Sequence, residues 1–158
     1  MIVLVFVLVI ILFGMISVTT DAFAEQSVKT IKSPDCKGKA LCIVDTVKKI
    51  VDGDTLYVKN YKKIRLSLTD TPEKDQTGFK QATDFTKKLC PVGSIITVDQ
   101  DDKHKKDQFG RILGKVYCSG MILNAELLYA SHAHISKYFC KKSEFATEDW
   151  AIKYGCKV

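Results

Sequence analysis

The sequence predicts an α+β fold that is mainly β, and three observations support this expectation. Apolar and polar residues alternate with a period of two in several short runs, which is typical of half-buried strands. The period changes to helical spacing at three other places. In chain order, these runs give three strands, a helix, two strands and two helices. That is the order of a five-stranded OB-fold barrel with three α-helices, although a small α+β sheet would give a similar order.

The first three strands are expected in the first part of the domain. Two runs of β-forming residues flank the dipeptide Asp52-Gly53, which is a strong signal for a hairpin turn. In the third run every second residue is apolar, which places Arg65 on the polar face of the strand. The three runs are LCIVDTVKKI (41–50), TLYVKN (55–60) and KIRLSL (63–68).

Helices and strands then alternate in the rest of the chain. The first helix has apolar residues at helical spacing and stops at Pro91. The third has Ser143 as its N-cap and Gly155 as its stop. The helices are expected at 78–90, 121–130 and 143–155, and the last two strands at 94–99 and 111–118.

The first 24 residues differ from the rest in composition. Residues 2–18 contain no charged side chain, and Ala22-Phe23-Ala24 is a cleavage pattern, so we expect a signal peptide that is cut before Glu25. The alternative is an uncleaved membrane anchor, because the neutral stretch approaches the length that spans a bilayer. Either way we expect export, to the periplasm or outside the cell. A polar linker is expected at 25–40 and the folded domain at 41–158.

Six cysteines follow the N-terminal segment, and an even number favours disulfides in an exported protein. A zinc site is not expected, because the sequence has no C-x-x-C pair and only three histidines. His132 and His134 are two residues apart and are expected to be surface or core residues rather than ligands. Among the possible pairings we favour Cys36–Cys42, Cys90–Cys118 and Cys140–Cys156.

The chain is basic after the N-terminal segment. From residue 25 it keeps all 24 basic residues and loses one of the 18 acidic ones, Asp21, so its net charge is 24 minus 17, or +7. This balance suits a polyanionic partner, but charge alone does not identify one. Only Arg65 and Arg111 among these basic residues are arginines.

Three short stretches concentrate functional residue types, and each alone has an ordinary structural explanation. Asp-Gly is typical of a hairpin turn, and Asp-Thr-Pro-Glu is typical of the start of a helix. A glycine followed by an arginine is typical of a loop that leads into a strand. The stretches are VDGDT (51–55), DTPE (70–73) and DQFGR (107–111).

Together, these stretches contain what the attack of water on a phosphodiester requires. Carboxylates and a backbone carbonyl are the ligands of a hard cation such as calcium, and a further carboxylate can activate a water molecule. Two arginines can each bind two phosphate oxygens, a geometry that lysine does not provide. The cation and the arginines would neutralise the charge that develops on phosphorus.

The motifs VDGDT, IRLSLTDTPE and DQFGRILGKVY, followed by LNAELL, resemble the staphylococcal nuclease (thermonuclease) family from about Val44 to Tyr154. The six cysteines resemble an exported branch of that family. The resemblance implies an OB-barrel nuclease that uses calcium to hydrolyse DNA and RNA to 3′-phosphate products. It implies catalytic roles for Arg65, Glu73 and Arg111, calcium ligation by Asp54, Asp70 and Thr71, and a supporting acid at Asp52.

The chain departs from the best-known members of that family in its expected substrate contacts. Gln108-Phe109 replaces a Lys-Tyr pair, and the tyrosines of the nucleotide pocket correspond to residues such as Lys137 and Phe139. These departures bear on base preference and affinity rather than on phosphate chemistry. The expected substrate-binding residues are Asp107, Phe109, Lys137 and Phe139.

Two other functions compete with a monomeric nuclease acting on DNA and RNA. An OB barrel can bind single strands without cutting them. A basic exported protein can also bind only anionic lipid. All six catalytic and calcium-binding positions are filled, which favours the nuclease.

Overall fold

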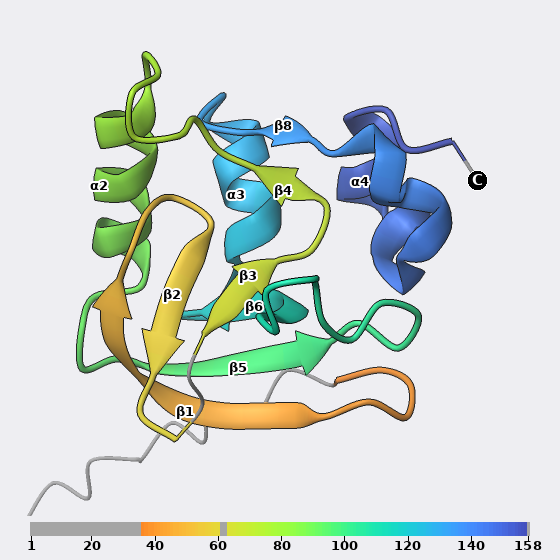
Figure 1. Ribbon diagram of the computed structural model, residues 1–158, viewed down its shortest axis with the longest axis horizontal. Helices are drawn as coiled ribbons and strands as arrows, with labels where there is room; N and C mark the ends of the chain where they lie inside the picture. The colour runs from red at the N-terminus through yellow and green to blue at the C-terminus, as the bar shows by residue number, and fades with distance from the viewer. Residues whose placement is uncertain (1–35, 61–62, 158) are drawn as a thin grey trace, which may run out of the picture. The chain divides into compact units, whose positions relative to one another are not determined.

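The computed structural model describes residues 36–60 and 63–157, and helices and strands are labelled as in Figure 1. The expected signal peptide at 1–24 and most of the expected linker at 25–40 lie outside these residues and stay predictions. Within the described ranges, no helix is both long enough and apolar enough to cross a bilayer.

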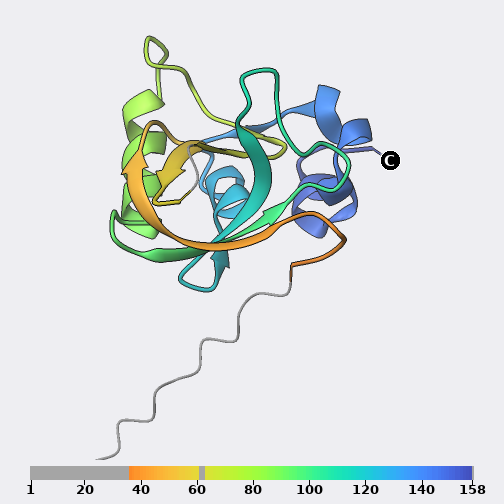
Figure 2. The same cartoon turned by 60° about the horizontal axis from the view of Figure 1, so that its bottom comes forward.

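Five strands form a closed barrel, which confirms the predicted OB fold. The strand order is β3-β2-β1-β5-β6, with antiparallel pairing between neighbours, and a parallel pairing of β3 with β6 closes the barrel. Figure 1 shows β1 and β5 running together along one edge, and Figure 2 shows the strong curvature of β1, coloured orange. The strands are β1 (Cys42–Ile50), β2 (Thr55–Val58), β3 (Ile64–Leu66), β5 (Ile95–Gln100) and β6 (Ile112–Cys118).

Three shorter strands were not predicted. The third predicted strand ends early because Leu68 has a left-handed backbone, with φ of 62°, which an extended strand cannot contain. The chain then forms β4 (Thr69–Asp70), which pairs with β8 (His134–Ile135). A third short strand, β7 (Met121–Ile122), pairs with the end of β6.

Two of the three predicted helices are present near their expected bounds, as α2 (Phe79–Leu89) and α3 (Leu123–Tyr129). The prediction of one continuous helix over 143–155 was wrong. That segment holds a three-ten helix, η2 (Glu144–Thr147), and then α4 (Asp149–Lys153). The reason is the extended backbone of Glu148, with ψ of 147°, which separates the two helical segments. Another three-ten helix, η1 (Lys137–Lys142), precedes them.

Two groups of buried apolar side chains make up the core. The larger group fills the barrel and includes Leu56, Ile64 and Val98, with α2 and α3 packed against the barrel. The smaller group, which includes Phe145 and Trp150, lies under the C-terminal helical segments. Because this second group is small, the C-terminal segments need further restraints.

Two buried polar side chains attach the helical segments to the barrel. The Asn124 side chain on α3 donates to the Ser67 carbonyl at 2.9 Å and accepts from the Val116 amide at 2.9 Å. Lys115 on β6 is 1% exposed, and its Nζ lies 2.5 Å from Oε1 of Glu148. Burial lowers the pKa of Lys115, but hydrogen bonding and charge interactions with Glu148 and Tyr117 outweigh it and raise the pKa above its usual value.

The three disulfides follow the pairing that the sequence analysis favoured. Cys36–Cys42 attaches the segment before β1, Cys90–Cys118 joins the end of α2 to the end of β6, and Cys140–Cys156 joins η1 to the C-terminal residues. All six cysteines lie within the described residues, and none is free. The disulfides therefore restrain both the barrel and the small C-terminal core.

Candidate active site

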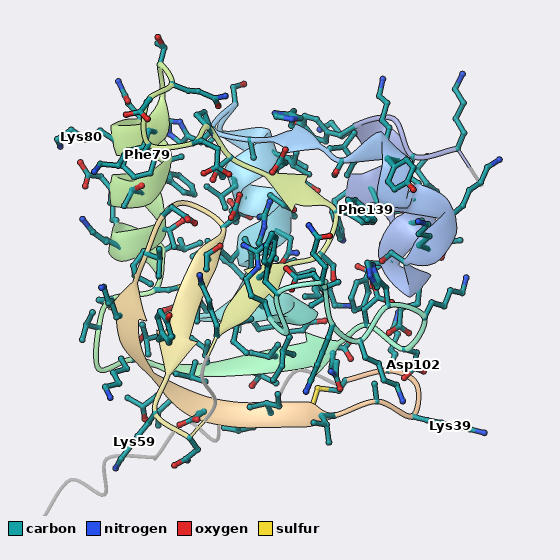
Figure 3. The ribbon with its side chains drawn as sticks, in the orientation of Figure 1. Lys39, Lys59, Phe79, Lys80, Asp102 and Phe139 are labelled. Atoms are coloured by element: carbon teal, nitrogen blue, oxygen red, sulfur yellow. A yellow bond between two sulfur atoms is a disulfide. The ribbon has the colours of Figure 1, made fainter. Side chains whose placement is uncertain are left out.

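A pocket of about 180 Å³ opens between the β3–β4 segment, the loop that precedes β6, and the C-terminal three-ten helices. Arg65 and Asp70 line one side of the pocket, and Asp107 and Arg111 line another. Phe139, labelled in Figure 3, reaches the pocket from η1. The pocket thus gathers residues from three parts of the chain that lie far apart in sequence.

Arg65 bridges the two aspartates that the sequence analysis predicted as calcium ligands. Its Nη1 lies 2.5 Å from Oδ1 of Asp54, and its Nη2 lies 2.5 Å from Oδ1 of Asp70. Nη1 also donates to the Thr69 carbonyl at 2.8 Å, and only 14% of the arginine side chain is exposed. The guanidinium is held in one orientation by three acceptors, in the planar fork geometry that suits carboxylates and phosphates.

Asp54 joins the first predicted stretch to the second. Its Oδ2 accepts hydrogen bonds from both the amide and the hydroxyl of Thr71, each at 2.7 Å. Close packing supports this junction, because a Cβ at Gly53 would lie 2.7 Å from Cγ2 of Thr71 and 2.8 Å from Cβ of Ala82. Only glycine fits between the hairpin turn, Thr71 and helix α2.

Asp52 lies behind this pair of residues. Burial raises the pKa of Asp52 to about 6, and the neighbouring charge of Asp54 adds to the shift. The Asp52 carboxylate accepts a hydrogen bond from the Asp54 amide at 3.1 Å, which links the two acids through the turn. Burial and a neighbouring negative charge both disfavour the ionised form of a carboxylic acid, which explains the raised pKa.

Asp107 fixes the loop that carries Arg111. One Asp107 oxygen accepts from the amides of Phe109, at 2.9 Å, and Arg111, at 3.0 Å, while the other contacts Nε of Arg111. Burial raises the pKa of Asp107, but the hydrogen bonds and charge of Arg111 outweigh it, so the pKa lies below its usual value. The Arg111 guanidinium lies 5.4 Å from the centre of the exposed Phe109 ring.

Comparison with known proteins identifies the family of this chain. The family model described as staphylococcal nuclease homologue matches residues 63–152, which include Arg65, Asp70 and Arg111. The chain belongs to the staphylococcal nuclease family.

Curated relatives of this staphylococcal nuclease homologue come from several bacteria. Two are described as uncharacterized endonucleases, one of Escherichia coli, 36% identical over 97 residues, and one of Escherichia coli O157:H7, 35% identical over 97 residues. These matches cover 59% of this chain and 61% of each relative. An uncharacterized protein of Bacillus anthracis is 36% identical over 121 residues, covering 68% of this chain and 56% of that protein. The chain therefore spans about three fifths of the length of the relatives it matches.

Not every predicted site residue of this staphylococcal nuclease homologue lies in the pocket. The backbone amide of Glu73 donates to Oε1 of Gln76 at 2.9 Å, and among the described residues its exposed carboxylate has no hydrogen-bond or ion-pair partner. Lys137 lines a separate hollow together with Tyr138 and Tyr154. Asp54 and Thr71 lie behind the pocket wall, linked to it through Arg65.

Two histidines contact predicted site residues, which the sequence analysis did not anticipate. Nε2 of His134 lies 3.2 Å from Oδ2 of Asp70, and 71% of the histidine side chain is exposed. His104 stacks on Phe139 with a distance of 5.6 Å between ring centres. The contact between His134 and Asp70 arises from the pairing of two strands of only two residues each. Such short strands leave no pattern in the local sequence.

The donor set of this nuclease homologue fits a hard cation. Within the described residues, no three Asp, Glu, His or Cys side chains gather at one point, so a cation would be held by two carboxylates and backbone oxygen. The side chains of Asp54 and Asp70 already converge on one positive group, the Arg65 guanidinium. Asp54, Asp70 and the Thr71 carbonyl are all oxygen donors, which calcium prefers over nitrogen or sulfur.

Proposed function

We propose that this protein is a calcium-dependent nuclease that hydrolyses phosphodiesters of DNA and RNA and leaves 3′-phosphate ends. The observation that carries the proposal is the Arg65 bridge between Asp54 and Asp70, with Arg111 on the same pocket. Membership of the staphylococcal nuclease family and two relatives described as endonucleases support it.

The two arginines bind and orient the phosphate in this proposal. Each guanidinium can donate two parallel hydrogen bonds to phosphoryl oxygens, and both are preorganised by acidic neighbours. A phosphate in the pocket competes with the Asp70 carboxylate for Nη2 of Arg65. Asp54, Asp70 and the Thr71 carbonyl would hold calcium, which would supply further neutralisation of the developing negative charge.

Glu73 acts as the general base in this proposal. It takes a proton from water, the water oxygen bonds to phosphorus, and the bond from phosphorus to the 5′-oxygen breaks. The departing 5′-oxygen takes a proton from solvent and leaves as a hydroxyl. Glu73 lies two residues after Thr71, whose amide and hydroxyl are bonded to Asp54, so its backbone is anchored beside the predicted ligands. Catalytic contacts are often long before substrate binds, so its exposed position is compatible with this role.

The purified protein, incubated with DNA and with RNA, tests the proposal. We expect strand scission with millimolar calcium and none in excess chelator. The products should take a 5′-label directly from a polynucleotide kinase without prior phosphatase treatment, because their 5′ ends are free hydroxyls. Binding without scission would contradict catalysis and favour the alternative, a non-catalytic nucleic-acid-binding module, which the separation of Glu73 from the pocket also favours.

Export is part of the same proposal. The apolar residues 2–18 and the Ala22-Phe23-Ala24 pattern support a secretory signal. Three disulfides among the described residues suit an oxidising compartment. Mass spectrometry of protein recovered from outside the cytoplasm tests it, with a chain that starts at Glu25 as the expected result.

A further inference from the structure

His134 and Asp70 face each other across a two-stranded antiparallel ladder. The register of β4 and β8 pairs Asp70 with His134 and Thr69 with Ile135. The Ser136 amide extends the pairing by donating to the Leu68 carbonyl at 2.8 Å. Because directly opposite residues on paired strands have close Cβ atoms, the backbone itself holds the imidazole next to the carboxylate.

The two oxygens of Asp70 have different neighbours. Oδ1 lies 2.5 Å from Nη2 of Arg65, and Oδ2 lies 3.2 Å from Nε2 of His134. The carboxylate therefore has a nitrogen group on each oxygen, and its plane is restrained from both sides. Removal of His134 would leave Oδ2 facing solvent.

The two aspartates also differ in how strongly the protein holds them. The Asp54 side chain is 6% exposed, and its Oδ2 accepts two hydrogen bonds from Thr71. The Asp70 side chain is 38% exposed, and its Oδ2 lies 3.2 Å from Nε2 of His134. Asp70 is thus the less restrained of the two, and the one whose orientation depends on a single additional side chain.

We propose that His134 is a positioning residue that orients Asp70 for calcium. This inference rests on the proposed function, in which Asp70 is a calcium ligand. His134 acts through the carboxylate and does not touch the cation. Partners that orient a ligating carboxylate typically change metal affinity about 10- to 100-fold when they are removed. We expect a value near the lower end, because the imidazole is 71% exposed.

The test measures calcium binding directly, by isothermal titration calorimetry of the full chain. His134→Thr keeps a strand-forming residue but is too short to reach Oδ2 of Asp70. His134→Gln keeps an N–H donor at a similar distance from the backbone. His132→Ala is the matched control, because it removes a histidine two residues away whose ring packs on Phe85, at 5.0 Å between centres.

We expect His134→Thr to weaken calcium binding about 10-fold. His134→Gln and His132→Ala should stay within about 3-fold of the parent, below the loss expected when an orienting partner is removed. Melting temperatures in chelator should be similar for the parent and both His134 variants, because the side chain is exposed.

Two results would overturn this inference and leave the proposed function intact. One is a parent and a His134→Thr variant that bind calcium equally well. The other is a loss in His134→Thr that His134→Gln shares fully, which would point to backbone structure instead of the side-chain contact. A parent that binds no calcium would overturn the proposed metal role of Asp70 and this inference with it.

Discussion

Asp54 and Thr71 are joined by two hydrogen bonds to a single oxygen, from the amide and the hydroxyl of Thr71 to Oδ2 of Asp54, both at 2.7 Å. Both residues are buried, at 4% exposure each. This link joins the turn after β1 to the segment that follows β4. It therefore positions two of the three predicted calcium ligands.

Thr71→Val should lower the free energy of unfolding by about 1–3 kcal/mol, because it leaves a buried carboxylate oxygen with one donor fewer. Urea denaturation in chelator measures this loss. Thr77→Val, at an exposed threonine, is the control and should stay within about 0.5 kcal/mol of the parent. Equal stability of Thr71→Val and the parent would show that the hydroxyl contributes nothing to the junction.

Arg65→Lys should lower the rate of single-turnover cleavage about 10²- to 10³-fold, because lysine cannot donate two parallel hydrogen bonds to phosphoryl oxygens. It should also lower the melting temperature, because Arg65 is 14% exposed and contacts Asp54, Asp70 and the Thr69 carbonyl. Rates should therefore be compared well below the melting temperature of the variant.

Lys63→Arg is the matched control for that experiment. Lys63 lies two residues away on the same segment, with its Nζ 5.8 Å from the centre of the Tyr57 ring. Arginine can make the same contact with the ring, so the cleavage rate should stay within a few-fold of the parent. A variant Arg65→Lys that cuts nucleic acid as fast as the parent would remove Arg65 from the mechanism.

Asp52→Asn should change how stability depends on pH. The pKa of Asp52 is raised from 3.8 to about 6 in the folded state, so the folded state holds this proton more tightly than the unfolded state. The contribution of Asp52 to stability is therefore present below pH 3.8 and is lost as the pH rises to about 6. In the variant this decrease should be absent.

Melting temperatures in chelator from pH 3.5 to pH 7.5 measure the difference between parent and variant. Chelator matters because a bound cation would favour the ionised form of Asp52. Asp75→Asn, at an exposed acid, controls for the loss of one negative charge. Parallel curves for the parent and Asp52→Asn would contradict the raised pKa.

Replacing Cys140 and Cys156 by alanine should destabilise the protein by about 3 kcal/mol, since the disulfide closes a loop of 16 residues. Replacing Cys36 and Cys42 should cost about 2 kcal/mol, because that loop spans only 6 residues. Urea denaturation of both double variants tests this order.

Affinity for nucleic acid should fall only in the variant that lacks Cys140 and Cys156, because Cys140 adjoins Phe139 in the pocket. The reverse order of stability would contradict loop length as the main factor.

The barrel could be predicted from sequence because alternation along each strand is a local signal. The strands around Leu56, Ile64 and Val98 show this alternation, and all three side chains are buried. The prediction of one helix over 143–155 was wrong because the helical spacing of apolar residues in the sequence continues through Glu148. The backbone there is extended instead, and the Glu148 carboxylate contacts Lys115 and Trp150. The contact with Lys115, 33 positions away in the chain, leaves no trace in local periodicity.

The predicted site residues also fall into two groups, those whose positions local motifs indicate and those whose positions depend on distant parts of the chain. Asp54, Asp70 and Arg65 lie together because Asp54 directly precedes β2, Arg65 lies on the paired strand β3, and Asp70 follows it by only five residues. The contact of His134 with Asp70 depends on the pairing of β8 with β4, and Lys137 lies on η1, which follows β8. The sequence around these residues contains no pattern that specifies this pairing.

The parallel pairing of β3 with β6 also bears on when the pocket can exist. It places Arg65 opposite Leu113, two residues beyond Arg111, although the two arginines are 46 positions apart in the chain (111 minus 65). Contacts between such distant segments carry a large loop-closure cost and form slowly. The pairing that closes the barrel therefore also brings the two arginines together, and a nascent chain that has not yet reached β6 lacks one side of this pocket.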